Sequence, residues 1–278
     1  MSDPAEELPV AVLDAVAPTS QRRILNRRGS AVWEVEGDRG HFAVKLGYPI
    51  EATPDWAAQP WTAHAPAREG SILYRLGVEG VSYGDWERGT WNAQPWREGP
   101  DLYDLWAGCR REERPIEPHV EVALSCAEAL ASLHRAGWSH GDVQPAHFIV
   151  GPTATHLIDL ALARGGWVPE GHDFPYRGCL VHYEAPEISA SVLAIGEAEP
   201  SPEADVYALG ASLLISATGW RAVEYPDDAP RGVQRQAVVD GRRRKVSVPG
   251  KLGALVDGML SYNPGDRPTI GEVVSALS

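Results

Sequence analysis

Cysteine is scarce in this 278-residue chain, and no apolar run approaches the roughly 20 residues that a membrane-spanning helix needs. Cys109, Cys126 and Cys179 are odd in number and lack paired spacing, which argues against a disulfide framework or a zinc site. The acidic start of the chain is unlike the basic start of a secretory signal. We therefore expect a cytoplasmic protein that does not bind membranes.

Basic side chains are also few, since 25 Lys and Arg residues stand against 38 Asp and Glu residues and the net charge is −13. This balance argues against a general nucleic-acid binder, which would need Lys and Arg to neutralise phosphates. The lysines are Lys45, Lys245 and Lys251. Because Lys45 lies inside an apolar segment, we expect it to be used for its compact ammonium group.

The segment 231–245 departs from this acidic background. We predict that it holds an acidic peptide substrate or a partner protein, and a loop that only solvates the surface is the alternative. Its basic residues are Arg231, Arg235, Arg242, Arg243, Arg244 and Lys245.

Hydrophobic residues make up 44% of the chain, which is enough to bury a substantial core. Residues 31–35 and 41–46 alternate apolar and polar side chains on either side of a turn-rich segment, a pattern that predicts a β-hairpin. Two Trp-containing segments, 81–87 and 90–96, predict two more antiparallel strands.

Apolar residues at helical spacing occur in residues 67–76, where Glu69 lies on the same face as the apolar side chains. The same spacing returns after Asp101, which is placed to cap a helix, then in residues 119–137 and again from Asp205 onward. Strands followed by helices are typical of an α+β fold.

The predicted domains follow from this order of elements. Residues 1–20 are expected to be an N-terminal tail, in which residues 8–16 are partly ordered or form a short first strand. Residues 21–98 are expected to form a strand-rich lobe and residues 99–278 a mainly helical lobe.

Two aspartates are spaced as phosphoryl transfer from a nucleotide requires. Asp142 lies in the short polar loop 139–150, and Asp159 follows an apolar segment further along the chain. In this reaction one carboxylate accepts the hydroxyl proton and the other holds the metal ion that bridges the phosphates. The pair predicts a phosphotransferase site.

Short motifs in a fixed order surround these aspartates, and each alone would be a weak signal. They are Phe42-Ala43-Val44-Lys45, His140-Gly141-Asp142, Asp159-Leu160-Ala161, Ala185-Pro186-Glu187, Asp205-Val206-Tyr207-Ala208-Leu209-Gly210 and Asp266-Arg267-Pro268-Thr269. Together, over residues 24–277, they resemble the eukaryotic-like Ser/Thr protein kinase superfamily, in a divergent bacterial form. The resemblance implies a bilobal α+β fold with a small antiparallel β lobe, one key helix in that lobe and a mainly helical second lobe.

The resemblance also implies roles for single residues. Lys45 would contact the phosphates of ATP, and Glu69 would hold Lys45, with Glu51 as the second choice. Asp142 would be the catalytic base, and Asp159 would bind Mg²⁺, with Mn²⁺ as the alternative metal.

The nucleotide-binding segments depart from the family pattern. Where the family has a glycine-rich loop, this chain keeps only Gly29, and Arg27 and Arg28 would compensate through their charge. The hinge between the lobes aligns with Gln94, Pro95 and Arg97. There the backbone of Pro95 and Arg97 would face adenine, and Pro95 could only accept a hydrogen bond because it lacks an N–H group.

The catalytic loop departs from the pattern as well. His147 stands where the family has an asparagine ligand, and imidazole suits Mn²⁺ or Zn²⁺ better than Mg²⁺. Gly141 replaces the arginine that reads a phosphorylated activation segment in many members, so that form of switching is not expected. Gln144 replaces a lysine that is frequent in protein-specific kinases.

The function implied is ATP-dependent phosphorylation of a Ser or Thr hydroxyl in a peptide or protein. The chain resembles stand-alone kinase-like proteins of ribosomal-peptide (lanthipeptide or thioamitide) biosynthesis, in which a partner lyase eliminates the phosphate. The alternatives are a pseudokinase that binds a peptide or partner enzyme without catalysis, and a kinase for small molecules.

Overall fold

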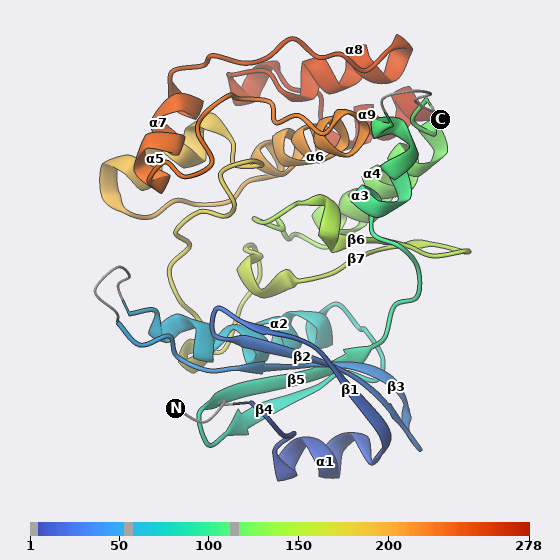
Figure 1. The fold of residues 1–278 in the computed structure, drawn as a ribbon, viewed down its shortest axis with the longest axis vertical. Coiled ribbons are helices and arrows are strands. Elements are labelled where there is room, and N and C mark those ends of the chain that lie inside the picture. The colour runs from blue at the N-terminus through green and yellow to red at the C-terminus, as the bar shows by residue number, and fades with distance from the viewer. Residues whose placement is uncertain (1–4, 53–57, 112–116) are drawn as a thin grey trace. The chain divides into compact units, whose positions relative to one another are not determined.

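A computed structural model of the chain describes residues 5–52, 58–111 and 117–278. Their contacts define two compact units, which consist of Met1–Arg97 with Gly166–Phe174 and of Glu98–Gly165 with Pro175–Ser278. The first unit is strand-rich and the second is mainly helical (Figure 1), which confirms the predicted α+β fold class. Residues 1–4 of the predicted tail lie outside the described residues.

The first unit is built on a five-stranded antiparallel sheet with the strand order β1-β2-β3-β5-β4. The predicted hairpin is present as β2 and β3, which pair from end to end and leave Asp38 and Arg39 as the turn. The strands are β1 (Pro18–Arg27), β2 (Ser30–Gly37), β3 (Gly40–Gly47), β4 (Ser82–Trp86) and β5 (Gly89–Pro95).

Side chains of the central strand β5 alternate between the two faces of this sheet. Trp91 and Ala93 are buried in an apolar cluster that includes side chains of helix α1 (Val10–Val16), whereas Asn92 and Gln94 hydrogen-bond to helix α2 (Ala65–Arg75) on the other face. Figure 1 shows the two helices on opposite faces of the sheet. The alternation therefore separates an apolar layer from a polar one.

Helix α1 (Val10–Val16) corrects one prediction, because residues 8–16 were expected to be a partly ordered tail or a short strand. Val12 and Val16 lie four positions apart on one helical face and are both fully buried in the apolar cluster of the sheet. The helix is only 7 residues long, so tertiary packing rather than local propensity stabilises it.

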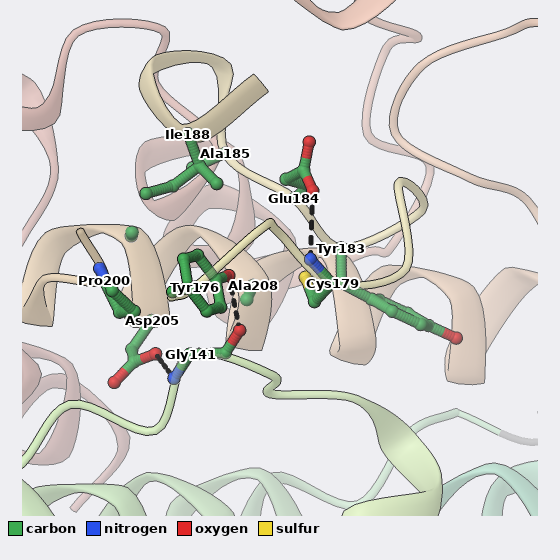
Figure 2. Close-up of a pocket in the computed structure, with 11 residues that line it drawn as sticks. Gly141, Tyr176, Cys179, Tyr183, Glu184, Ala185, Ile188, Pro200, Asp205 and Ala208 are labelled. Carbon is green, nitrogen blue, oxygen red and sulfur yellow. Dashed lines mark hydrogen bonds between the residues drawn. The ribbon is translucent and has the colours of Figure 1, made fainter. Parts of the chain in front are cut away.

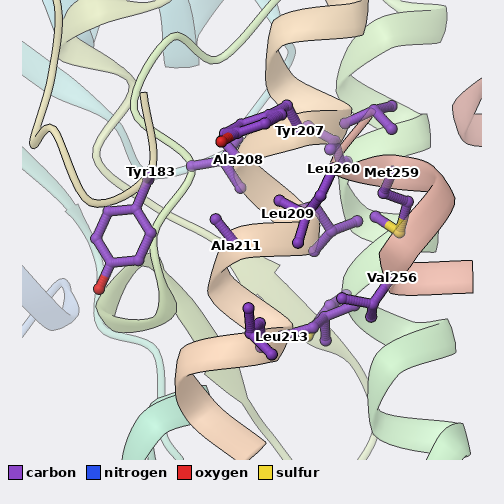
Figure 3. Close-up of a cluster of buried hydrophobic side chains, with 14 of the residues drawn as sticks. Tyr183, Tyr207, Ala208, Leu209, Ala211, Leu213, Val256, Met259 and Leu260 are labelled. Atoms are coloured by element: carbon purple, nitrogen blue, oxygen red, sulfur yellow. The ribbon is translucent and has the colours of Figure 1, made fainter. Parts of the chain in front are cut away.

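The second unit packs its helices around α6 (Pro202–Thr218), which is buried on nearly all sides. Leu209 of α6 lies beside Met259 and Leu260 at the end of α8 (Figure 3). A Cβ atom on Gly210 would come within 2.9 Å of the Cβ atom of Met259, so glycine permits this close approach. The remaining helices are α3 (Leu102–Leu105), α4 (Val120–Arg135), α5 (Pro186–Ile195), α7 (Arg231–Val239), α8 (Gly250–Met259) and α9 (Ile270–Leu277).

The loop that contains Asp142 leads into a short two-stranded sheet of β6 (Phe148–Val150) and β7 (Thr155–Leu157) in the second unit, and Asp159 follows β7. The antiparallel pairing of β6 with β7 turns the chain back between the two aspartates. Among the described residues, no helix combines the length and the apolar character needed to cross a membrane.

Candidate functional site

The first unit brings Lys45 of β3 together with Glu69 of α2. The Lys45 Nζ atom lies 2.9 Å from Glu69 Oε1 and 2.8 Å from Glu69 Oε2, and the Glu69 side chain is almost completely buried. Glu51, the second choice for this pairing, is exposed in the connection after β3. A buried carboxylate is stable only where it is paired and hydrogen-bonded, so the contact with Lys45 stabilises both groups.

Two amide side chains complete the surroundings of Glu69. Asn92 Nδ2 donates to Glu69 Oε2 at 3.1 Å and to the backbone carbonyl of Pro66 at 2.8 Å, and Gln94 Nε2 donates to Glu69 Oε1 at 3.2 Å. Sequence reasoning assigned Gln94 to the hinge and did not single out Asn92. The sequence did contain a signal for both donors, because polar residues occupy every second position of this otherwise apolar strand.

The residues predicted to contact the nucleotide lie at the ends of the strands. Arg28 and Gly29 form the tight turn between β1 and β2, with φ values of 53° and 77°, and Arg27 ends β1. A Cβ atom on Gly29 would come within 2.7 Å of the Tyr48 carbonyl oxygen, so this glycine is required by packing. Pro95 ends β5, and Arg97 follows two residues later. Their nucleotide contacts stay predictions.

In the second unit the loop that contains Asp142 is anchored by Asp205 at the start of α6. Asp205 Oδ2 accepts from the backbone N–H of His140 at 2.6 Å and contacts His134 Nε2 at 2.9 Å, and its Oδ1 accepts from the N–H of Gly141 at 2.9 Å. Gly141 has φ of 76°, a left-handed conformation that glycine adopts without strain. The carboxylate thus fixes the backbone directly before Asp142.

Asp142 is held through only part of its carboxylate. Gln144 Nε2 donates to Oδ2 at 3.1 Å, whereas Oδ1 is buried and has no hydrogen-bond partner within the described ranges. A buried acceptor without a donor is costly in a folded protein, and a hydroxyl group or a water molecule that donates to Oδ1 would satisfy it.

The ring of His140 supports this loop as a neutral imidazole. Its Nε2 donates to the Ile158 carbonyl at 3.0 Å, and its Nδ1 accepts from the backbone N–H of Asp142 at 3.1 Å. Burial, with the neighbouring His147, lowers the pKa of His140 to about 4. The two hydrogen bonds therefore define one tautomer.

His147 lies between the two aspartates. Its Nδ1 donates to the backbone carbonyl of Asp142 at 2.9 Å, and its Nε2 is 3.3 Å from Asp159 Oδ2. Because Nδ1 carries a proton in this arrangement, a hydrogen bond from Nε2 to Asp159 requires the second ring proton of the imidazolium form. A metal ion held by Asp159 would take the place of that proton, with Nδ1 still held by a carbonyl.

The charges of this cluster and its burial shift the pKa values of Asp142 and His147. Burial raises the pKa of Asp142 to about 6, and the charge of Asp159 adds to the effect, while His147 and Gln144 act against it. Burial alone would lower the pKa of His147, but the hydrogen bond and charge of Asp159, together with Asp142, leave it above its usual value. Carboxyl groups with raised pKa values are typical of acid–base chemistry near neutral pH.

Asp159 and His147 are the side chains that could hold a divalent cation. Within the described part of the chain, His, Cys, Asp and Glu side chains form no group of three or more that could bind a metal. Two protein ligands are sufficient for Mg²⁺ or Mn²⁺ when water and substrate phosphates supply the other positions. The residues present therefore fit a metal that arrives with a nucleotide.

A small cavity lies behind the loop, with a volume of about 10 Å³, which is enough for about one water molecule. Tyr176 closes it by donating from its hydroxyl to the Gly141 carbonyl at 2.6 Å, and the backbone N–H of Cys179 donates to Glu184 at 3.0 Å (Figure 2). The cavity is too small for a substrate, so these residues act as a brace for the loop.

Two ion pairs hold the segment after this brace. Arg267 forms a bidentate pair with Glu187 at 2.7 and 2.8 Å. Arg235 forms another with the fully buried Glu184 at 2.7 and 3.0 Å. Arg235 was predicted to belong to a surface that holds an acidic partner, and its burial against Glu184 removes it from that surface.

Residues 166–174 pack against helix α2 of the first unit. Arg68 Nε lies 3.0 Å from Asp173 Oδ1, and the guanidinium carbon is 5.4 Å from the ring centre of Phe174. Phe174 in turn packs against Trp61 with the two rings tilted and their centres 5.3 Å apart. No local pattern predicts these contacts, because Arg68 and Asp173 are 105 positions apart. Arg68 is next to Glu69 in sequence, so side chains outside the helix hold the same turn of α2 on both sides.

No family model matches the chain. It is similar to the "Receptor like protein kinase S.3" of Arabidopsis thaliana, with 30% identity over 60% of this chain and 51% of the plant protein. It is similar to the serine/threonine-protein kinase PkaA of Streptomyces coelicolor, with 29% identity over 65% of this chain and 32% of that protein. For the serine/threonine-protein kinase PknK of Mycobacterium tuberculosis, the identity is 29% over 54% of this chain and 13% of that protein.

The chain thus spans about half the length of the plant relative and less of the bacterial ones. It is similar to Ser/Thr protein kinases over more than half of its own length. With its strand-rich and helical units, it has a protein-kinase-like α+β fold.

Replacing Gln94 with leucine is expected to lower the free energy of unfolding by about 1–3 kcal/mol, because buried Glu69 loses a donor. Urea unfolding measures this difference. The exposed Gln21→Leu variant on β1 is the control and should stay within about 0.5 kcal/mol of the parent. In a Glu69→Met background the cost of Gln94→Leu should shrink, and equal costs in both backgrounds would contradict the contact.

The raised pKa of Asp142 predicts a pH-dependent stability. The native state keeps the Asp142 proton up to about pH 6, whereas the unfolded chain loses it near 3.8, so this residue destabilises the fold progressively between these values. Asp142→Asn should therefore be more stable than the parent at pH 7 by on the order of 2 kcal/mol, and equally stable near pH 3.5. Thermal unfolding across this range measures the effect. A pH-independent difference, or an equal gain for the exposed Asp228→Asn control, would contradict it.

Proposed function

We propose that the chain is an ATP-dependent phosphotransferase that phosphorylates a Ser or Thr hydroxyl of a peptide or protein. The observation that carries this proposal is the buried Asp142 carboxylate, whose Oδ1 has no donor among the described residues while Oδ2 is held by Gln144. The relatives named as serine/threonine-protein kinases support the same reaction class.

In this mechanism Asp142 Oδ1 accepts the hydrogen bond of the acceptor hydroxyl and orients its oxygen for in-line attack on the γ-phosphorus. With a pKa of about 6, the carboxylate is mostly ionised at neutral pH and basic enough to take the proton as the new P–O bond forms and the bond between the γ-phosphorus and the β-phosphate oxygen breaks to release ADP. Asp205 holds the backbone of this loop, so little reorganisation is needed when the hydroxyl arrives.

The nucleotide would be held by the residues that the sequence assigned to it. The Lys45 ammonium group would bind phosphate oxygens, and Glu69 keeps it oriented. Arg27, Arg28 and Gly29 at the turn between β1 and β2 would add charge and backbone donors. The backbone of Pro95 and Arg97 would face the adenine ring.

Asp159 and His147 would hold the divalent cation, which supplies positive charge to the phosphate oxygens of the leaving group. The orientation of His147 Nε2 supports this assignment, because its partner Nδ1 is already engaged by the Asp142 carbonyl. An imidazole ligand favours Mn²⁺ relative to Mg²⁺.

A finer proposal concerns the acceptor. The chain would act on a precursor peptide whose phosphate is eliminated by a separate partner lyase, and Gln144 in place of the usual catalytic-loop lysine supports an acceptor other than a general protein substrate. Such precursors therefore belong in the panel of acceptors that is tested.

The proposal is tested by incubating the protein with ATP, either metal and a panel of Ser- or Thr-containing peptides, and following the gain of one phosphate by mass spectrometry. The Asp142→Asn variant is expected to reduce the rate by about 10²–10⁴-fold, because general-base catalysis is lost. The exposed Glu51→Gln variant is the matched carboxylate control and should keep the parent rate.

The alternatives give different outcomes in this assay. A pseudokinase would bind a peptide without any gain of phosphate, and a small-molecule kinase would modify only small alcohols. An absence of nucleotide binding by calorimetry with both Mg²⁺ and Mn²⁺ would sink the enzyme proposal, and an Asp142→Asn variant with full activity would sink the assignment of the base.

The metal assignment makes a separate prediction for His147→Asn. In the presence of nucleotide, Mn²⁺ affinity measured by electron paramagnetic resonance should fall by at least roughly tenfold, a loss typical even of residues that only orient a ligand. Mg²⁺ affinity should fall less, because an amide oxygen is a suitable ligand for that ion. The exposed His119→Asn variant is the control, and equal Mn²⁺ affinity in all three proteins would contradict a ligand role for His147.

A further inference from the structure

A second cavity in the helical unit has a volume of about 280 Å³ and opens where helix α6 ends. None of its lining residues belongs to the loop of Asp142 or to the brace behind it. Its polar and aromatic lining consists of Thr218, Trp220, Arg221, Arg244, Lys245 and Ser247.

Two chain segments form a fixed scaffold for this cavity. Val223 and Arg243 form an antiparallel bridge, and the backbone N–H of Arg244 donates to the Ala222 carbonyl at 2.7 Å. Val223 is buried in a small apolar cluster with Tyr225. The backbone that carries the two arginines is therefore paired and packed rather than free to reorganise.

Both guanidinium groups are oriented by aromatic rings. The Arg221 guanidinium carbon lies 4.3 Å from the ring centre of Tyr225, and that of Arg244 lies 4.9 Å from the ring of Trp220. Cation–π stacking leaves the edges of the planar groups for hydrogen bonds, and Arg221 Nη2 uses one of them to donate to the Tyr225 carbonyl at 2.9 Å. Such pre-organised forks match carboxylate oxygens.

The arginines have acidic partners, but these lie at the exposed rim. Arg221 pairs with Asp227 at 2.7 Å and Arg244 pairs with Glu224 at 3.0 Å, and both acidic side chains are more than 70% exposed. Ion pairs with exposed partners are worth about 0–1 kcal/mol, so another carboxylate can replace them. The Arg244 Nε atom is buried and finds no acceptor in the part of the chain that the structure describes.

The chemistry of the lining selects among anions. The net charge of −13 repels a long polyanion such as a nucleic acid, whereas a short segment is affected mainly by charges within a Debye length of about 8 Å. Lys245 adds a third positive charge, and the indole of Trp220, 61% exposed, offers an apolar face. A short peptide with carboxylate side chains satisfies all of these groups.

We infer that this cavity binds a short acidic segment of the peptide or protein that accepts the phosphate, through carboxylates paired with Arg221 and Arg244. The identity of the segment as part of the acceptor rests on the proposed function, whereas its binding does not. Of the predicted surface of residues 231–245, Arg244 and Lys245 line this cavity. Trp220 and Arg221, which sequence reasoning did not single out, line it as well.

The test measures fluorescence anisotropy of labelled hexaglutamate with the full chain, without nucleotide or metal. Hexaglutamate should bind and weaken with added salt, and labelled hexaglutamine of the same length should not bind. The double variant Arg221→Gln/Arg244→Gln should bind at least about tenfold more weakly, because two charge-assisted pairs are lost. The variant Arg22→Gln removes an arginine of the first unit that is also paired with a glutamate but is more exposed, and it should bind as the parent does.

The milder variant Arg244→Lys keeps the positive charge but loses the paired donors of the guanidinium group, so it should weaken binding to an intermediate extent. Thermal unfolding checks that this variant keeps its fold. Equal affinity of the parent and the double variant, or equal binding of both peptides, would overturn the inference. In the transfer assay, acceptors that carry an acidic segment should show a raised KM and unchanged kcat with the double variant. A chain that binds hexaglutamate but transfers no phosphate would refute the proposed function alone, and an active chain without this binding would refute the inference alone.

Discussion

The buried carboxylate of Asp205 is the contact on which the rest of the site depends. It accepts two backbone N–H groups of the loop and contacts His134, and it lies in the first turn of α6, where the helix dipole favours a negative charge. Because a buried carboxylate must have such donors, the loop backbone can adopt few other conformations. The positions of Asp142 and His147 follow from this constraint.

The first unit is also organised around a buried carboxylate with several donors, in this case that of Glu69. Glu69 is held by one ammonium group and two amides, so that each of its oxygens has more than one donor. Around Asp142 the structure does the opposite, since one oxygen is left without a donor and the pKa is raised. Fully satisfied carboxylates thus build the scaffold, and an incompletely satisfied one marks the place where chemistry is expected.

The sequence was sufficient for the features that repeat along the chain. Alternation predicted β2 and β3, helical spacing predicted α2 and α4, and Asp101 does cap α3 through the N–H of Asp104. Helix α1 was missed because seven residues carry too little periodicity, and its two buried valines acquire meaning only against the sheet. The amide donors of Glu69 and the contact of Arg68 with Asp173 were missed because pairing across long sequence separations leaves no local pattern.

The contact between Arg68 and Asp173 also bears on what keeps residues 166–174 packed against helix α2. The side chain of Arg68 is almost fully buried, while the carboxylate that neutralises it reaches solvent with about half of its surface. That negative charge is encoded in the gene, so it is present from the moment the chain folds and no phosphatase can remove it. The ion pair that holds this segment therefore forms when the chain folds and lasts as long as the folded protein does.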